Sequence, residues 1–316
     1  MSVPRLAVAA VAAALTLAAC GSAPAAGPAA ATGEGFPVSV TRCGHEQTFV
    51  APPERVVLGW PTTQRTLAAL GVADRVTGYV SGALAPMPAG STAQEVSPDF
   101  KPAKEAVLAA RPGLFLANDE NQISGAEGTA SWADLDAAGG RGFVLGGYCL
   151  DAPAPDTLDA VYTDIRDLGS IFGVRDRADQ VVTDLQRRVT TAAAKGGGAR
   201  VAVVQVYDGK VAALAGSYYN AIVAGAGMTN VFAGLGQNFA EISAEQVLTS
   251  TPDAIIAVHD DPAGADAAVA AAREAFASTP AVAAGKVSAM SSVDISGGGV
   301  NIVDLVEQAA TAVHGP

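Results

Sequence analysis

The chain has 316 residues, which is enough for two domains with a sizeable core. Half of its residues are apolar, but only 5% are aromatic. The net charge is −12, and so acidic a chain is a poor candidate for binding nucleic acid or an anionic membrane surface, both of which rely on lysine and arginine.

The first twenty residues have the pattern of an export signal. Arg5 supplies a positive start, an apolar run follows from Leu6 to Leu17, and Leu17-Ala-Ala-Cys20 closes the segment. The run of about 12 residues is too short to span a bilayer, which needs roughly 20. Residues 1–20 resemble a bacterial lipoprotein signal, which is cut before the cysteine that is then lipidated, here Cys20. An ordinary secretory signal with an incidental cysteine is the alternative.

Residues 21–35 are rich in glycine, alanine and proline and have no apolar periodicity, so they are predicted to be a flexible tether. Removal of Arg5 with the signal leaves 18 basic residues against 31 acidic ones, a net charge of −13. A lipid on Cys20 would therefore have to supply the attachment to the membrane.

Two cysteines remain once Cys20 is assigned to the lipid. They are Cys43 and Cys149. An even pair in an exported chain predicts a disulfide, which would join the start of the folded part to the segment just before its middle. Two free, buried thiols are the alternative.

Residues 36–155 alternate between strand and helix patterns. An early hairpin or edge strand is expected over 36–49, and a buried strand over 55–59 is followed by a helix to Leu70 and a second strand near Gly78. Strand, helix, strand is the unit of a parallel sheet. The further elements predicted in this lobe are a helix that contains Glu105, a strand that ends at Ala117, a helix over 132–138 and a strand over 142–146.

Residues 156–195 carry apolar side chains at steps of three and four, as on one face of a helix. Asp156 is a plausible helix cap, and Gly196-Gly-Gly198 ends the pattern. Gly169 and Gly173 indicate a kink or a short break. The segment is predicted to join two lobes.

Residues 196–316 repeat the plan of the first lobe. Glu105-Ala-Val-Leu before Pro112 corresponds to Glu245-Gln-Val-Leu before Pro252, and each proline precedes an apolar strand. Other strands are expected over 200–207 and 286–289, and helices over 217–226, 269–275 and 302–313. The two halves predict an α/β protein of two lobes with parallel or mixed sheets, helices on both faces of each sheet and a ligand cleft between the lobes.

Several motifs, weak singly but consistent in order and spacing, carry a family resemblance from Phe36 to the C-terminus. The chain resembles the substrate-binding lipoproteins of ABC importers that capture ferric siderophores, haem or cobalamin. The resemblance implies two Rossmann-like lobes bridged by a long α-helix. Gly113 departs from the pattern, because the family usually has Asp there, as at Asp253. The motifs are Pro53-Glu-Arg-Val-Val, Leu67-Ala-Ala-Leu-Gly-Val-Ala-Asp-Arg-Val-Thr-Gly78, the two Glu/Pro segments, Leu168-Gly-Ser-Ile-Phe-Gly173 and Gly227-Met-Thr-Asn230-Val.

The resemblance also implies a function and its partners. A ferric siderophore is expected first, with haem, cobalamin or a non-transport scaffold or sensor role as alternatives. An ABC permease with its ATPase is the expected partner, and Glu105 and Glu245 are similar to the pegs by which the family docks on permease arginines. For either Glu alone, a solvated helix start is the alternative reading. The protein is expected to be an extracytoplasmic monomer that closes only modestly on its ligand, because a helical bridge resists wide opening.

Candidate ligand contacts are aromatic or polar residues near strand ends, together with two arginines that could pair with an anionic ligand. Core or rim packing is the alternative for each aromatic residue. Iron is expected to arrive as a chelate, with no cofactor and no metal held directly by the protein, because a lone His after a strand is more often structural. The candidates are Trp60, Arg65, Tyr79, Asn118, Arg141, Tyr148, Tyr218, Tyr219 and His259.

An exported enzyme is the main rival. The sequence contains no Gly-x-Ser-x-Gly, no phosphate loop ending in Gly-Lys-Ser/Thr and no complete Gly-x-Gly-x-x-Gly; Gly225-Ala-Gly227-Met-Thr-Asn230 lacks the third glycine. A binding protein without enzymatic activity is therefore the prediction.

Overall fold

The computed structural model describes residues 1, 35–81, 87, 89–152, 155–235, 237–261 and 263–314. The predicted lipoprotein signal with Cys20, and the tether as far as residue 34, lie outside the described residues apart from Met1. Everything described from Gly35 onward belongs to one unit, Thr32–Pro316. Within the part of the chain that the structure describes, no helix has both the length and the apolar character needed to cross a membrane.

The first lobe is built on a sheet of five parallel strands in the order β5-β4-β3-β6-β7. An antiparallel hairpin of β1 (Val38–Arg42) and β2 (His45–Phe49) precedes it, as the sequence predicts. The sheet strands are β3 (Val56–Leu58), β4 (Val76–Val80), β5 (Gln94–Ser97), β6 (Leu114–Ala117) and β7 (Gly142–Val144).

Successive side chains of these strands point to opposite faces, so each face has its own core. Val57 and Phe115 pack on one face with residues of α2 (Lys104–Ala109) and α3 (Trp132–Ala137). Val56, Leu58 and Leu116 pack on the other face with residues of α1 (Gln64–Leu70) and α4 (Asp159–Ile171).

The second lobe contains a mixed sheet of six strands. Four lie side by side in the order β9-β8-β12-β13, β11 adds to β9, and the short β10 pairs with β8. β8, β10, β12 and β13 are parallel to one another, whereas β9 is antiparallel to β8 and β11 is antiparallel to β9. The strands are β8 (Arg200–Tyr207), β9 (Lys210–Ala213), β10 (Thr229–Asn230), β11 (Ala240–Ile242), β12 (Ala254–His259) and β13 (Val287–Ser291).

Helices cover both faces of this sheet as well. One face packs against residues of α7 (Ala244–Ser250), α8 (Ala265–Ala275) and α9 (Pro280–Ala283). The other packs against residues of α5 (Arg175–Gly196), α6 (Ser217–Gly225) and α11 (Val300–Ala312), with α10 (Ser292–Ser296) leading into α11.

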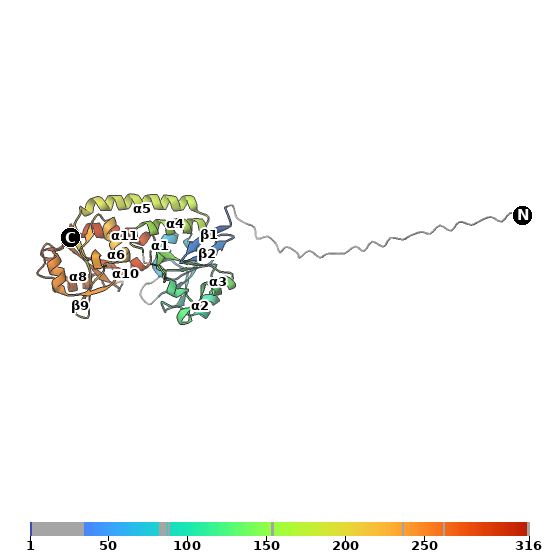
Figure 1. Cartoon of the computed structure of the whole chain (residues 1–316), viewed down its shortest axis with the longest axis horizontal. Coiled ribbons are helices and arrows are strands. Elements are labelled where there is room, and N and C mark those ends of the chain that lie inside the picture. Colours follow the sequence, from blue (N-terminus) through green and yellow to red (C-terminus); the bar gives the residue numbers. More distant parts are fainter. Residues whose placement is uncertain are drawn as a thin grey trace. The chain divides into compact units, whose positions relative to one another are not determined.

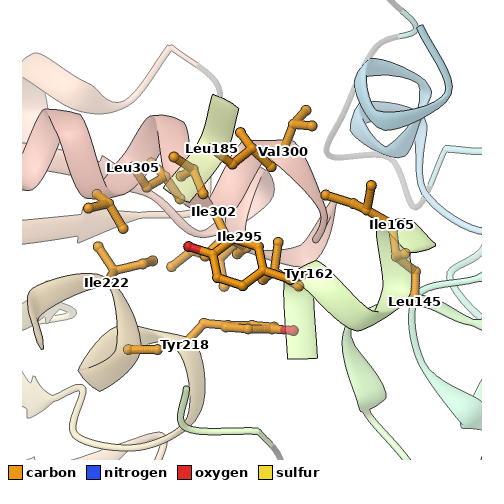
Figure 2. Close-up of a cluster of buried hydrophobic side chains, with 14 of the residues drawn as sticks. Leu145, Tyr162, Ile165, Leu185, Tyr218, Ile222, Ile295, Val300, Ile302 and Leu305 are labelled. Carbon is orange, nitrogen blue, oxygen red and sulfur yellow. The ribbon is translucent and has the colours of Figure 1, made fainter. Parts of the chain in front are cut away.

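The inner faces of the two sheets share one hydrophobic core. Leu145 and Ile165 of the first lobe lie in the same cluster as Ile222 and Ile302 of the second (Figure 2). One face of each sheet therefore packs against a core within its own lobe, and the other face packs against the core that both lobes share. Apolar burial holds the two lobes together as well as building each of them.

The segment predicted to bridge the lobes is two helices rather than one. α4 ends at Ile171 and α5 begins at Arg175, with Gly173 at a φ of +70° in the turn between them. Asp156 is not the cap that the sequence indicates, because the helix begins after Leu158. The 22-residue α5 contacts α4 and α1 of the first lobe and α6 and α11 of the second (Figure 1), so α5 alone is the bridge.

Hydrogen bonds join the lobes along a seam, which we define as residues 60–66 of the first lobe and 293–301 of the second. Trp60 Nε1 donates to Val293 O at 2.9 Å, and Thr63 Oγ1 donates to Gly297 O at 3.2 Å. Two further bonds run from Val300 N to Thr66 Oγ1 at 3.2 Å and from Asn301 Nδ2 to Thr62 O at 3.1 Å. A Cβ at Gly297 or Gly299 would collide with these threonine side chains, so the close approach requires glycine.

Candidate ligand-binding cleft

A cavity of about 440 Å³ lies between the two lobes. Such a volume is within the range of small-molecule sites. The first lobe contributes Phe100, Asn118, Asp119 and Tyr148, and the second contributes Gln205, Leu214, Tyr219, Asn238, Phe239, Asp260, Ser292, Ile295 and Ser296. We call this cavity with its lining residues the cleft.

The cleft lies at the carboxyl ends of parallel strands in both lobes. Asn118 and Asp119 follow β6, Asp260 follows β12, and Ser292 follows β13. Ligands of open α/β sheets bind at this edge. Other cavities lie along α5, with charged side chains such as Arg175 and Asp184 in their walls, and they draw on no strand end. The cleft is therefore the candidate site.

Asn118 lines the cleft and contains a buried, unpaired acceptor. The residue is 5% exposed, its backbone N donates to Gln122 Oε1 at 3.1 Å, and its side-chain Oδ1 has no hydrogen-bond partner among the described residues. A buried carbonyl oxygen without a partner costs free energy, which a donor on a ligand would recover.

Two tyrosines, one from each lobe, line the cleft. Tyr148 OH lies 3.3 Å from Ser217 Oγ. Burial raises the pKa of Tyr148, the bond to Ser217 lowers it, and the nearby Asp119 carboxylate raises it. Burial is also the main cause that raises the pKa of Tyr219, with smaller contributions from Tyr148 and Asp260. Both phenols are therefore neutral near pH 7 and offer hydrogen bonds and ring faces rather than charge.

A disulfide and a buried Glu support the cleft wall from behind. Cys43 and Cys149 are joined, with their Cα atoms 5.2 Å apart. Glu120 N donates to Tyr148 O at 3.0 Å, and Glu120 Oε2 accepts from Leu150 N at 2.7 Å. Cys43, Glu120 and Cys149 are close enough for their ligand atoms to surround a metal ion, but the disulfide engages both sulfurs.

Three aromatic candidates lie outside the cleft lining. Tyr218 is fully buried, and its OH donates to Gly146 O at 3.2 Å across the two lobes. Trp60 belongs to the seam, with its ring 6.1 Å from that of Phe100 in the cleft wall. Tyr79 lies within β4 and packs against the shared core. In this structure they support the lobes and their joint.

The charged candidates also lie elsewhere. Arg65 pairs with Asp294 and Asp304 on the second lobe. Arg141 precedes β7, at the edge of the sheet opposite to the ligand edge, and its Nε donates to Thr48 O at 2.9 Å. His259 ends β12, and its Nδ1 lies 2.6 Å from Asp261 O. Arg65 and Arg141 are not among the residues that line the cleft, so ligand binding by either arginine stays a prediction.

The two glutamates of the repeated motif occupy matching places. Glu105 is exposed in the first turn of α2, and Glu245 is exposed in the first turn of α7. Ser243 and Gln246 form a capping box at the start of α7. Docking on a permease through these glutamates stays a prediction.

Residues 56–293 match the model of the family described as periplasmic binding protein. The chain belongs to this family. Its members bind solutes outside the cytoplasm, and the two-lobed fold with an interlobe cleft is the fold found here. A search of curated proteins found no significant match.

Solved structures share the fold over most of the chain. An ABC-type Fe³⁺-hydroxamate transport system from Saccharomonospora viridis is 25% identical, with a TM-score of 0.69 and coverage of 88% of this chain and 99% of that one. The petrobactin-binding protein YclQ from Bacillus subtilis is 16% identical, with a TM-score of 0.69 and coverage of 89% and 100%. The periplasmic haem-binding protein HutB of Vibrio cholerae is 19% identical, with a TM-score of 0.67 and coverage of 81% and 97%.

Proposed function

We propose that this periplasmic binding protein captures a ferric siderophore, or a related iron chelate, in the cleft and delivers it to an ABC permease. The observation that carries the proposal is the cleft itself, with aromatic residues from both lobes and the unpaired Asn118 Oδ1 in one wall. The 25% identity to the Fe³⁺-hydroxamate transport protein of S. viridis, over nearly its whole length, supports an iron chelate as the cargo.

The chemistry of the cleft suits a bulky chelate. Phe100 and Phe239 supply apolar surface, whereas Tyr148, Tyr219 and Asn118 supply the few polar groups that orient a ligand. Iron would enter already enclosed by its chelator, so the protein would recognise the organic shell. The role is capture and release, with no chemical step.

Delivery needs a place at the membrane and a way to meet the permease. A lipid on Cys20 would hold the protein at the cell membrane through the tether. Glu105 and Glu245 would steer the closed monomer onto basic residues of the permease, since exposed charge pairs orient a complex and still release readily.

A fluorescence titration tests the proposal. The protein has two tryptophans, and the Trp132→Phe variant leaves only Trp60, whose ring lies beside Phe100 of the cleft wall. The chain from Gly21 onward, which contains the whole folded unit, is titrated with ferric hydroxamate, catecholate and citrate chelates. Saturable quenching with a dissociation constant of about 1 μM or tighter, roughly −8 kcal/mol, is expected for one class.

The iron-free chelators serve as the control for quenching by the chelator alone. Saturable binding of haemin or cobalamin, with none of any ferric siderophore, would replace the proposed cargo. The absence of binding by all of these ligands would refute the transport function and favour a scaffold role.

A further inference from the structure

The charge of the cleft restricts which iron chelates it can hold, and this inference rests on the proposed function. The residues that line the cleft include two carboxylates, Asp119 and Asp260, and no arginine, lysine or histidine. Beyond residue 34, the positions that the structure does not describe are Gly, Ala, Leu and Pro only, so they add no charge.

Lysine and arginine side chains around the cleft lining pair with other carboxylates, and His259, which precedes Asp260, has its Nδ1 2.6 Å from Asp261 O. Lys101 Nζ lies 2.6 Å from Glu127 Oε1, and Lys210 Nζ lies 3.1 Å from Glu241 Oε2. Arg65 pairs with two aspartates of the second lobe. An anionic ligand in the cleft would therefore meet two negative side chains and no positive one among the residues that line the cavity.

The cleft wall presents unused acceptors. Asp119 Oδ1 accepts from Asn121 N at 2.7 Å, whereas the other carboxylate oxygen, Oδ2, has no hydrogen-bond partner in the described part of the chain. Asn118 Oδ1, next to it in sequence, is buried and unpaired. Across the cleft, Asp260 also lines the cavity, and its two oxygens accept from Gln205 Nε2 at 2.7 Å and from Ser292 Oγ at 2.5 Å.

We propose that the cleft selects iron chelates whose overall charge is zero or positive, and that it rejects polyanionic chelates and haem. Asp119 and Tyr148 of the first lobe, and Asp260 and Tyr219 of the second, line the same cavity, so each lobe contributes an anion and an aromatic ring to it. This combination suits a protonated amine on a chelator, which gains from both the carboxylate and the ring face. Like charges brought together reject the competing ligands.

A pair of ligands that differ in one charge tests this inference. Ferrioxamine B is a ferric trihydroxamate with one protonated amine, and its N-acetyl derivative lacks that charge. Ferric enterobactin carries three negative charges, and haemin carries two carboxylates. For the unaltered protein we expect the affinity to fall in the order ferrioxamine B, its N-acetyl derivative, then the anionic ligands, with at least about a tenfold gap before the last group.

Substitution of the two cleft aspartates tests whether they cause the charge preference. Asp119→Asn with Asp260→Asn should weaken ferrioxamine B about tenfold, leave the neutral derivative within about twofold, and strengthen ferric enterobactin. Asn at position 119 retains the acceptor that caps the following turn, Asn at position 260 retains one acceptor oxygen, and unfolding by urea checks the fold. Asp266→Asn with Asp208→Asn, two exposed carboxylates that do not line the cleft, gives the same change in net charge and should leave the order unchanged.

Each outcome decides one question. Tight binding of ferric enterobactin or haemin by the unaltered protein would overturn the charge rule while leaving chelate capture intact. The charge rule would also be overturned if the cleft substitutions left the order of ligand affinities unchanged, or if the control substitutions altered that order equally. If no chelate of any charge binds, the proposed function itself fails, and the charge rule fails with it.

Discussion

The same two lobes meet in two contrasting ways, at the seam and at the cleft. Along the seam, the polar groups of one lobe mostly bond to those of the other, as between Trp60 and Val293, and between Thr66 and Val300. Asn118, which lines the cleft, has an Oδ1 that is buried and unpaired. Asn301 Oδ1, in the seam, is also unpaired and buried. An orphan oxygen marks a binding site only where there is room for a ligand.

The contrast predicts how the protein moves. A shared core, a bridging helix and seam hydrogen bonds hold one side of the lobes together, whereas the cleft side is joined by few bonds, such as that between Tyr148 and Ser217. Ligand capture should therefore close the cleft slightly and leave the seam unchanged. The following predictions alter one side at a time.

The largest effect is expected from Arg42→Met, on the packed side. Arg42 forms an ion pair with the buried Asp164, with Nη2 2.6 Å from Oδ1. The same Nη2 donates a hydrogen bond to Asp167 Oδ2. Asp164 accepts from Gly146 N, and Gly146 O accepts from Tyr218 of the other lobe, so the ion pair supports the joint. Removal of one partner of a buried pair costs about 3–5 kcal/mol of the free energy of unfolding.

This loss should depend on pH. Burial raises the pKa of Asp164 to about 6, above its ordinary value of 3.8, while Arg42 lowers it. Without Arg42 the pKa rises further, so the folded state binds a proton more readily than the unfolded state does. The variant should be least stable at alkaline pH and should recover as the pH falls through the raised pKa, which lies above about 6, towards the ordinary value of 3.8.

Urea unfolding at several pH values measures this effect. Arg187→Met, which removes only an exposed pair with Asp184, is the matched control and should cost less than about 1 kcal/mol. A loss in Arg42→Met that is below about 1 kcal/mol, or that does not vary with pH, would mean that the ion pair does not support the joint.

Substitution of the adjacent residues Tyr218 and Tyr219 tests the packed side and the cleft side separately. Tyr219→Ala removes an aromatic face of the cleft and should weaken chelate binding about tenfold, or about 1.4 kcal/mol. Tyr218→Phe leaves Gly146 O without its donor and should lower the free energy of unfolding by about 1 kcal/mol with unchanged affinity. Chelate titration and urea unfolding are applied to both variants. A larger loss of affinity in Tyr218→Phe than in Tyr219→Ala would reverse the assignment.

The smallest effect on stability and affinity is expected at the proposed docking residues. Glu105→Ala with Glu245→Ala should change the free energy of unfolding by less than about 0.5 kcal/mol, because both side chains are exposed. Uptake of radioactive iron by cells that carry the permease should nevertheless fall strongly. Glu274→Ala, an exposed residue of α8, is the control. Normal uptake by the double variant would exclude the docking role.

Much of the fold could be predicted from the sequence. Buried apolar runs located β8 at residues 200–207 and predicted a strand after Pro252, which is β12, because such strands carry their own hydrophobic signal. The antiparallel β9 was missed, although Asp208-Gly209 is a hairpin signal; both residues have positive φ, 47° and 72°, as such a turn requires.

The site was less predictable. Asn118, Tyr148 and Tyr219 were expected at the cleft and line it. Which of two adjacent tyrosines is buried depends on the rotation of α6, which tertiary packing sets. Arg141 precedes β7, so the direction of this strand places it at the edge of the sheet opposite to the cleft, which the sequence-based prediction did not consider.

Of the cleft residues that were not predicted, some carry a recognisable signal in the sequence and others carry none. Asp260 and Ser292 directly follow β12 and β13, so the strand-end rule would have found them. Asn238 and Phe239 lie in a loop before β11 and carry no local signal.

Hydrogen exchange of the backbone amides, measured with and without a saturating ferric chelate, tests the central claim most directly. We expect the amides of residues 117–120 and 237–241, in the two walls of the cleft, to gain protection, while those of α1 and α11 at the seam stay unchanged. Protection near the α4–α5 turn instead, or a change throughout α5 and α11, would contradict a ligand held in the cleft between firmly joined lobes.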